Sequence, residues 1–310
     1  MDHYLGIEIG GTKIQMVSSD QDLNIVHHSH FLVGEIKDAH FIQQEIEKRI
    51  GEHLSRYPTQ SIGVGFGGPI HAETGQILTS FQVHGWEGFN LKNWLTEKTG
   101  LPTFVDNDAN IAALAESTVG SGRPYKTVFY ITLGSGVGGG FVLENEIYHG
   151  GKVGEFEIGH LRMDKNGTTL EACCSGWALN KKLKQYLESH PKSALAKYAH
   201  EDSANASKYL MKAIQNGDTG ADRIFQEMIA NLAHGLSHLI HLVNPEVICI
   251  GGGLSLIGSY LIESIHNVLP NYLMELIKQN APDIKLAELG ALVVPIGAVL
   301  HAKNELQKNN

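Results

Sequence analysis

Two patterns of apolar and polar positions alternate along the chain. In residues 38–56 an apolar residue recurs at every fourth position, which predicts a helix with one apolar face. The stripe consists of Ile42, Ile46, Ile50 and Leu54. Further helices are predicted at residues 91–99, 109–119, 224–239 and 290–302, the last with a frayed polar tail, and buried strands at 61–66, 102–105 and 247–250. Strands that alternate with helices in this way predict an α/β protein.

Two glycine loops each lie between a pair of short apolar runs. The first occupies residues 10–13 and the second residues 134–140, and both predict a turn that joins two strands. Because glycine has no Cβ, the backbone N–H groups of such a turn can converge on an anion. Two of these turns in one chain indicate a duplicated architecture that holds one polyphosphate from both sides. The expected chemistry is phosphoryl transfer.

The second loop also contains the spacing Gly-x-Gly-x-x-Gly, which invites a dinucleotide-binding interpretation. That motif requires a helix directly after the turn and an acidic residue about 20 positions later. The apolar residues 141–143 instead continue as a strand, so the sequence disfavours a dinucleotide site. A Walker-type phosphate loop is absent from the sequence.

Composition and charge limit the kinds of binding partner and the cellular compartment that we expect. A length of 310 residues suits two domains, and 42% hydrophobic residues with 18% charged ones are typical of a globular protein. The net charge of −9 argues against a nucleic acid partner, and no apolar stretch is long enough to span a membrane. Three cysteines (Cys173, Cys174 and Cys249) form no disulfide framework, so we expect a cytoplasmic protein. A bound phosphate must then be held by backbone N–H groups, a cation and a few basic side chains.

A series of motifs occurs in a fixed order along the whole chain. They lie at residues 10–13, 65–69, 85–86, 107–110, 134–140, 157–160, 170–171, 251–253 and 295–298. In this order they resemble the ROK family of sugar kinases, within the actin-like, Hsp70-like and hexokinase-like ATPase fold. The resemblance implies a small domain over residues 1–119, joined by a C-terminal helix at about 291–305, and a large domain over 120–290. The two domains are expected to close over a cleft.

The resemblance also implies the reaction. ATP with Mg²⁺ would phosphorylate a hexose or an N-acetylhexosamine at the 6-hydroxyl, with glucose, N-acetylglucosamine, N-acetylmannosamine, fructose and mannose as candidates. Asp108 follows a strand and precedes an Ala-rich helix, so its local interpretation is a helix N-cap. In the family the matching Asp is the general base, which accepts the proton of the attacking hydroxyl. Asn107 is expected to hold a sugar hydroxyl beside it.

Other polar residues are implied to bind the sugar. On composition alone, a solvated loop and a sugar-binding segment explain residues 157–171 equally well. The sugar-binding positions implied by the family are Gly67, Gly68, Asn107, Asp108, Glu157, His160 and Glu171. Before the Gly85-Trp86 turn, Gln82 stands where the family commonly has Asn, which leaves the sugar's identity open.

Nucleotide binding is assigned to three glycine segments. The residues implied are Gly10, Gly11, Thr12, Lys13, Thr132, Gly134, Gly136, Gly252 and Gly253, the last two under the adenosine. Glu8 stands where the family usually has Asp. Either carboxylate can hold the hydration shell of Mg²⁺, so Glu8 is the predicted metal contact.

The family's zinc site has no counterpart in this sequence. Most relatives place three cysteines after the Glu-x-Gly-His motif, and with the histidine these form a closed structural site. Residues 161–169 contain no cysteine, and Cys173 and Cys174 follow later. We therefore predict no zinc, and a loop after His160 that packing and hydrogen bonds hold. A second group (His234, His238 and His241) has helical spacing but no accompanying carboxylate pair, so we expect no metal there either.

The sequence is compatible with two alternative functions, and the resemblance also suggests an oligomeric state. The phosphate donor could be polyphosphate, because some polyphosphate-using relatives also lack the zinc cysteines. The protein could also be a non-catalytic, sugar-binding regulator, although regulatory members carry a helix-turn-helix before the first hairpin and this chain begins at that hairpin. Since many relatives are dimers, a homodimer is expected.

Overall fold

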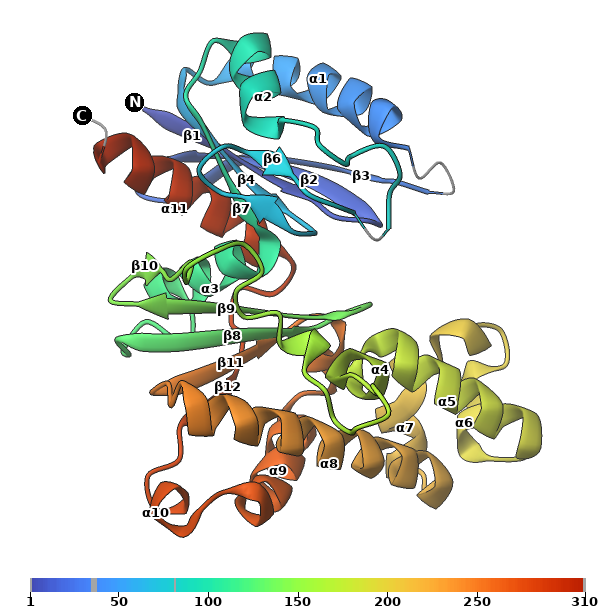
Figure 1. Ribbon diagram of the computed structural model, residues 1–310. Helices are drawn as coiled ribbons and strands as arrows, with labels where there is room; N and C mark the ends of the chain where they lie inside the picture. Colours follow the sequence, from blue (N-terminus) through green and yellow to red (C-terminus); the bar gives the residue numbers. More distant parts are fainter. Residues whose placement is uncertain (1, 35–37, 81, 309–310) are drawn as a thin grey trace. The chain divides into compact units, whose positions relative to one another are not determined.

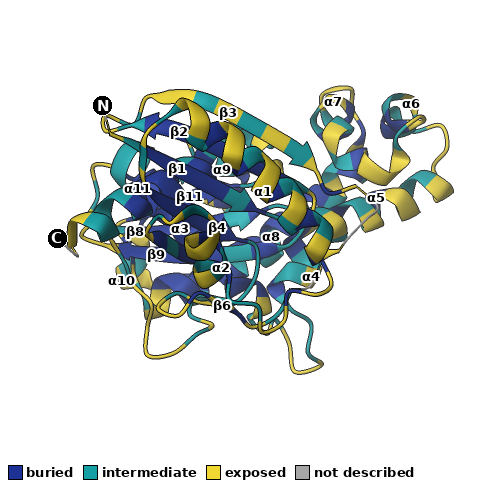
Figure 2. Ribbon diagram, turned by 90° about the horizontal axis from the view of Figure 1, so that it is seen from above, coloured by how far each residue is buried: buried dark blue, intermediate teal, exposed yellow. Residues whose placement is uncertain are grey.

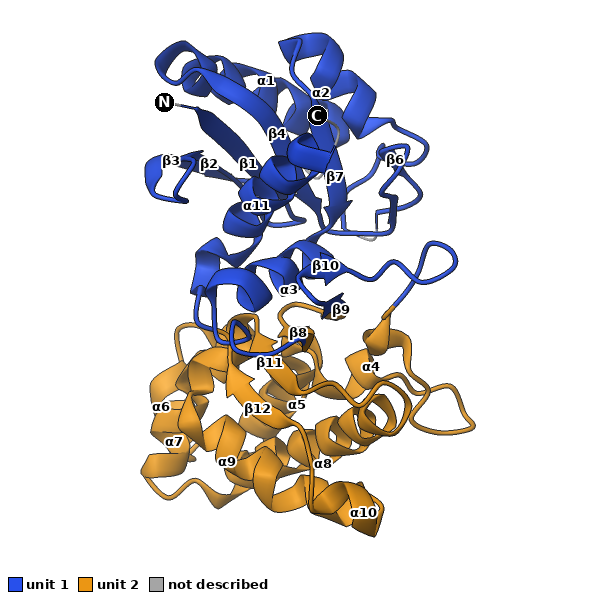
Figure 3. Ribbon diagram, turned by 90° about the vertical axis from the view of Figure 1, so that its left-hand side faces the viewer, with its two compact units in different colours: residues 1–126, 140–155, 288–310 blue, residues 127–139, 156–287 orange. Residues whose placement is uncertain are grey.

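The computed structural model describes residues 2–34, 38–80 and 82–308, and the chain divides into two units (Figure 3). Unit 1 comprises Met1–Lys126, Gly140–Glu155 and Glu288–Asn310, and unit 2 comprises Thr127–Gly139 and Phe156–Ala287. The domains expected from the sequence were residues 1–119 with about 291–305, and 120–290. The units additionally assign residues 140–155 to the same body as the first hairpin.

Unit 1 is built on a five-stranded sheet of order β3-β2-β1-β4-β7. The strands are β1 (His3–Ile9), β2 (Lys13–Asp20), β3 (Ile25–Leu32), β4 (Thr59–Phe66) and β7 (Thr103–Asn107). The first three are antiparallel, whereas β4 and β7 continue the sheet in parallel. Two short strands, β5 (Ile70–His71) and β6 (Gln76–Ile77), form a separate hairpin.

Helices cover both faces of this sheet (Figure 1). They are α1 (Ala39–Arg56) and α2 (Leu91–Thr99) on one face, and α3 (Asp108–Val119) and α11 (Val293–Lys308), preceded by the short η5 (Gly290–Leu292), on the other. Helix α11 lies very close to the strands: a Cβ placed on Gly63 would lie 1.8 Å from Ala298 O, and one on Gly6 would lie 2.2 Å from Pro295 O. The absence of side chains at these two glycines therefore lets the helix pack directly on the sheet.

The second sheet has the order β10-β9-β8-β11-β12, and the division between the units falls within β9. Its strands are β8 (Thr127–Leu133), β9 (Val137–Leu143), β10 (Glu146–Ile147), β11 (Val247–Gly251) and β12 (Asp283–Leu286). Strand β11 runs parallel to both β8 and β12. Its five residues are all buried, as expected for a parallel strand in the middle of a sheet.

Helices make up most of unit 2. They are α4 (Leu170–Cys174), α5 (Gly176–Ser189), α6 (Ala194–Ala199), α7 (Leu210–Gln215), α8 (Thr219–Leu242), α9 (Ser259–Val268) and α10 (Glu275–Lys278), with short 3-10 segments η1 (Ile158–His160), η2 (Ser203–Tyr209), η3 (Gly253–Ile257) and η4 (Leu269–Tyr272). Helix α8 packs against α4, α5, α7 and α9 and buries one apolar stripe. Figure 2 shows the inner strands β1, β4 and β11 buried, whereas the edge strand β3 and the outer faces of α1 and α5 are largely exposed.

Most of the expected elements are present. The α/β class is confirmed, and both glycine loops join two strands. Because β9 follows the second loop directly, a dinucleotide-binding turn is ruled out there. The expectation of a frayed tail after residue 302 was wrong: α11 continues to Lys308, whose Nζ donates to Glu146 at 2.5 Å and to Glu305 at 2.8 Å. Over the ranges described, no helix is long and apolar enough to cross a membrane.

Candidate active site

The first glycine hairpin, between β1 and β2, is closed by its own backbone and touched by a distant side chain. The N–H of Gly10 donates to Lys13 O at 3.1 Å. A Cβ placed on Gly11 would lie only 2.0 Å from Gln82 Oε1. Gly11 therefore needs to be glycine because Gln82 lies against it. The structure thus places Gln82, expected to face the sugar, against the predicted phosphate loop.

Glu8 lies one residue before the end of β1 and is held by two partners. Gln15 donates its amide to Glu8 Oε2 and also to Ala291 O, the latter at 2.6 Å. Lys13 Nζ is 3.8 Å from the same carboxylate. Burial raises the pKa of Glu8, and Lys13 and Gln15 partly oppose this shift. A partly buried carboxylate beside the glycine turn has the hard oxygen ligands that a hydrated Mg²⁺ prefers.

The turn from β7 into α3 brings the predicted base, Asp108, close to Gly67 and Gly68, two of the predicted sugar-binding residues. Asn107 is the N-cap of α3, because its Oδ1 accepts from Ala109 N at 2.9 Å and Asn110 N at 3.4 Å. The local interpretation of Asp108 as the N-cap was therefore wrong: Asp108 is the first helical residue. The capping role is filled by Asn107 and not by Asp108.

Glycines surround this turn. Asn107 Nδ2 donates to Gly68 O at 3.2 Å, and Gly67 N–H donates to Ile9 O at 2.9 Å. A Cβ placed on Gly67 would lie 3.3 Å from Asp108 Oδ2. Asp108 and Asn107 therefore lie against a surface without side chains, at the end of β1.

Unit 2 holds the second glycine hairpin, and Glu171 is attached to it. Glu171 Oε2 accepts from Val137 N–H at 2.9 Å, and a Cβ placed on Gly136 would lie 2.4 Å from this oxygen. A Cβ placed on Gly134 would lie 3.7 Å from the hydroxyl oxygen of Thr132. The structure therefore groups Thr132, Gly134, Gly136 and Glu171 at one turn. The predicted contact of Glu171 with a sugar stays a prediction.

The remaining predicted residues of unit 2 pack on the same hairpin. Gly159, between Glu157 and His160, lies so close that a Cβ placed on it would be 2.1 Å from Val137 O. Gly252 has a φ of 80°, in the left-handed region, and a Cβ placed on it would lie 2.6 Å from Leu133 C. Glu157 is half-buried, whereas His160 and Gly253 are exposed. The segment with Glu157 and His160 thus contacts β9, and the predicted adenosine loop contacts β8.

The sequence matches the ROK family model over residues 4–305. The chain belongs to the ROK family. It is 32% identical to the glucokinase of Halalkalibacterium halodurans over 99% of this chain and 98% of the relative, and 29% identical to the glucokinase of Thermotoga maritima over 87% and 88%. It also matches the crystal structure of a ROK family glucokinase from Streptomyces griseus in complex with glucose and AMPPNP, with a TM-score of 0.86, 27% identity and coverage of 97% of this chain and 99% of that one. The fold is that of the ROK sugar kinases, an actin-like ATPase fold with two sheets.

The loop after His160 contains no cysteine and is held by hydrogen bonds. Asp164 accepts from Asn166 N at 2.8 Å, Thr168 N at 3.1 Å and Thr168 Oγ1 at 2.7 Å. Arg162 donates to Gly167 O, and Thr169 caps α4. Hydrogen bonds within the loop thus fix its conformation, as the sequence led us to expect.

Neither the cysteines nor the histidine group forms a metal site among the residues that the structure describes. Cys174 is buried and Cys173 half-buried, and burial raises the pKa of both thiols. His234 stacks on Tyr272, and His241 Nε2 accepts from Met274 N at 3.3 Å. The absence of zinc stays a prediction.

Two polar residues near the site were not singled out in the sequence. Gln15 is 2% exposed and holds Glu8, and Asp106 is 2% exposed and lies directly before Asn107. Both are polar residues within or at the end of predicted buried segments. That position is the signal that could have identified them, because a polar group is buried only where hydrogen bonds compensate its desolvation.

Proposed function

We propose that this ROK family member transfers the γ-phosphoryl group of ATP to the 6-hydroxyl of a hexose or N-acetylhexosamine. The observation that carries the proposal is the position of the Asp108 carboxylate, 3.3 Å from a Cβ placed on Gly67 and beside Asn107. The glucokinases among its relatives, and the glucose and AMPPNP complex of one of them, support this substrate class.

In this mechanism each residue has a chemical task. Asp108 accepts the hydroxyl proton as the sugar oxygen attacks phosphorus, and Asn107 holds the neighbouring hydroxyl. Gly67 and Gly68 form the floor on which the sugar lies. Lys13 and the N–H groups of the first glycine turn bind the terminal phosphates. Glu171, Glu157 and His160 bind further sugar hydroxyls.

Two further groups of contacts belong to the nucleotide. The second glycine turn, with Thr132, Gly134 and Gly136, binds the phosphates, and Gly252 and Gly253 lie under the adenosine. Mg²⁺, held through its water by Glu8, would neutralise negative charge on the phosphates. We also propose a homodimer in the cytoplasm.

The test is a coupled ADP-release assay with ATP and Mg²⁺ against a panel of hexoses and N-acetylhexosamines, beginning with glucose. Asp108→Asn should lower kcat by about 10²–10⁴-fold, because it removes the base and leaves the shape of the turn. Asp22→Asn, an exposed residue outside the site, serves as the matched control and should retain full activity. Undiminished turnover in Asp108→Asn would refute the role of the base. Turnover with polyphosphate and not with ATP would reassign the donor.

A further inference from the structure

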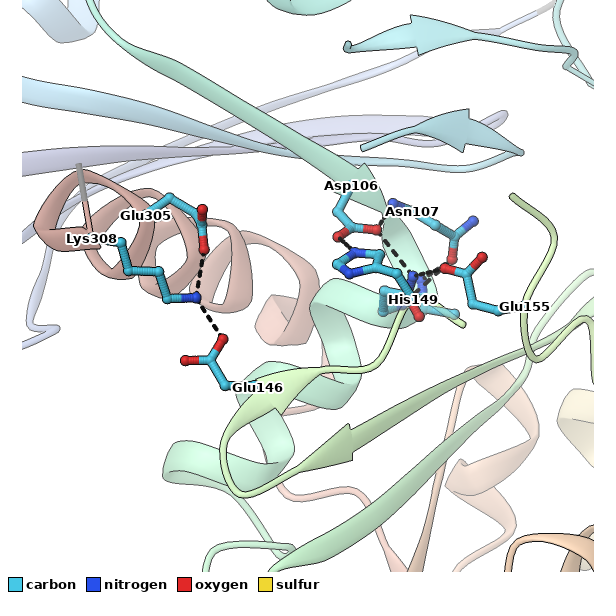
Figure 4. A network of polar contacts seen from close by, with 9 residues as sticks. Asp106, Asn107, Glu146, His149, Glu155, Glu305 and Lys308 are labelled. Atoms are coloured by element: carbon cyan, nitrogen blue, oxygen red, sulfur yellow. Dashed lines mark hydrogen bonds and ion pairs between the residues drawn. The ribbon is translucent and has the colours of Figure 1, made fainter. Parts of the chain in front are cut away.

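A buried carboxylate directly before the proposed catalytic turn connects three segments of unit 1. Asp106 is 2% exposed. Its Oδ1 accepts from Asn107 N at 2.7 Å and from Asn110 Nδ2 at 3.0 Å, and its Oδ2 forms a hydrogen bond with His149 Nε2 at 2.6 Å (Figure 4). Both oxygens therefore have partners, which is the condition for burying a carboxylate.

His149 is the partner that comes from farthest along the chain. It lies just after β10, with its side chain 44% exposed, and it lines a hollow of about 1010 Å³. The hydrogen bond to Asp106 raises the pKa of His149, against the opposing effect of burial. Burial alone would raise the pKa of Asp106, but His149, His301 and Asn110 hold it below its usual value. Opposite shifts in the two partners are those expected of an ion pair.

Asn110 is a second link between Asp106 and the chain segment that contains His149. Besides Asp106, its Nδ2 donates to Glu155 Oε1 at 2.9 Å. Residues 149 and 155 lie near the two ends of a segment without helix or strand, between β10 and η1. A segment of this kind depends on tertiary contacts for its conformation. The Asp106 network (Asp106, His149, Asn110 and Glu155) supplies them.

The end of this segment is strained. Phe156 has a φ of 54°, in the left-handed region that a bulky side chain rarely adopts, and it directly precedes Glu157. Such a conformation persists only where neighbouring contacts maintain it. The bond between Asn110 and Glu155 is one such contact, next to Phe156 in the chain.

We propose that Asp106 is a positioning residue for sugar binding. Through His149 and Asn110 it holds the segment that leads into Glu157, and through the N–H of Asn107 it holds the turn that carries Asp108. The inference rests on the proposed function, because Glu157 and Asp108 act on the sugar only if the protein binds one. It assigns a function to residues for which the proposed mechanism gives no contact with sugar or nucleotide.

This role predicts a pH dependence. The charged groups that act on His149 are Asp106 on β7, Glu155 in the segment, and His301 and Glu305 on α11. Glu146 and Lys308 line the same hollow but pair with each other. Below its raised pKa, His149 is an imidazolium that pairs with Asp106 as an ion. When the pH rises through that pKa, the charge is lost and the segment is held less firmly. The KM for the sugar should therefore rise at alkaline pH.

The experiment compares Asp106→Asn and His149→Gln with a control in the same hollow. Glu146→Gln removes the ion pair with Lys308 and touches no member of the Asp106 network. We expect both network variants to raise the KM for the sugar roughly tenfold to a hundredfold, with the KM for ATP unchanged. His149→Gln should also abolish the alkaline rise in the sugar KM. Glu146→Gln should behave as the wild type does.

Two measurements keep the result independent of turnover and folding. Calorimetry gives the sugar Kd of each variant, and NMR titration of His149 should show its pKa falling in Asp106→Asn. If Asp106→Asn does not fold, His149→Gln carries the test, because His149 is partly exposed. A sugar KM and Kd equal to those of Glu146→Gln would overturn the inference while leaving the proposed function intact. A wild-type protein that neither binds nor phosphorylates any sugar would overturn both.

Discussion

The two ends of helix α3 are each held by a buried carboxylate, but with different kinds of partner. At the N-terminal end, Asp106 is bound by the side chains of His149 and Asn110 and by one backbone N–H. At the C-terminal end, Glu116 is 0% exposed. It accepts from Ser121 N at 2.9 Å, Ser121 Oγ at 3.1 Å, Glu288 N at 3.1 Å and Leu289 N at 2.9 Å.

The difference in partners makes Glu116 a constant anchor and Asp106 a contact that depends on pH. Backbone N–H groups do not titrate, so the donors of Glu116 are constant over the ordinary pH range. They belong to the segments at which the chain leaves unit 1, near Lys126, and returns to it at Glu288. Asp106 instead depends on a histidine, whose charge changes near neutral pH. We infer that the C-terminal end of α3 fixes the fold, whereas the N-terminal end tunes the site.

The largest effect is expected at the anchor. Glu116→Ala leaves three backbone N–H groups without their acceptor and opens a cavity, so the free energy of unfolding should fall by about 4 kcal/mol. Urea denaturation measures this change. Ser117→Ala is the matched control: its buried hydroxyl donates only to Leu114 O within the helix, and its loss should cost about 1 kcal/mol. Equal losses in the two variants would show that Glu116 is no anchor.

A smaller loss of unfolding free energy is expected at the N-terminal end of α3. Asp106→Ala should lower the free energy of unfolding by about 2 kcal/mol, because the partly exposed His149 can turn to water while the Asn110 amide stays buried. The same urea titration compares it with Glu116→Ala. A greater loss in Asp106→Ala than in Glu116→Ala would reverse the proposed order of the two ends.

The pH dependence of stability should distinguish the ends further. Because the pKa of His149 is raised, its stabilising contribution is complete below about pH 6.5 and is lost as the pH rises through the folded value. Because the pKa of Asp106 is lowered, its contribution is present above about pH 4 and is lost as the pH falls through its folded value. The cost of His149→Gln should therefore be greatest between these limits and decline toward pH 9.

The control for this titration is Ser121→Ala, which removes one hydroxyl from the Glu116 site. Its cost should stay constant between pH 6 and pH 9, since the hydroxyl does not titrate in that range. Urea denaturation at each pH provides both curves. A cost of His149→Gln that is independent of pH would mean that the hydrogen bond alone, without the charge, stabilises the pair.

The sequence predicted the elements whose signals are local. Helix α2 begins and ends as expected, because Gly100 follows it with a φ of 71°. Helix α1 begins one residue after its predicted start, because Asp38 is its N-cap. At α3, Asn107 and Asp108 are both able to cap, and only the backbone geometry shows that Asn107 does so.

Contacts between distant segments were beyond such reasoning. Nothing near His149 indicates that its partner is Asp106, and the ordered end of α11 depends on Glu146 in another segment. Glu116 offered a partial signal, as a carboxylate among the apolar residues of an Ala-rich helix, but two of its donors, Glu288 N and Leu289 N, lie far along the chain. For the candidate site, glycine motifs located the loops, whereas the side chains that fix their positions became visible only in the structure.

The smallest effect on stability is expected at Asp164, a carboxylate that accepts as many hydrogen bonds as Asp106 but is exposed. Asp164 accepts three hydrogen bonds within the loop after His160, and these bonds lower its pKa, with the Thr168 hydroxyl contributing most. The side chain is exposed, so in Asp164→Ala water replaces the lost acceptor and the melting temperature should not change measurably. Differential scanning calorimetry beside Asp106→Ala measures this. Equal drops in melting temperature would mean that the number of hydrogen bonds, and not burial, determines what each aspartate contributes.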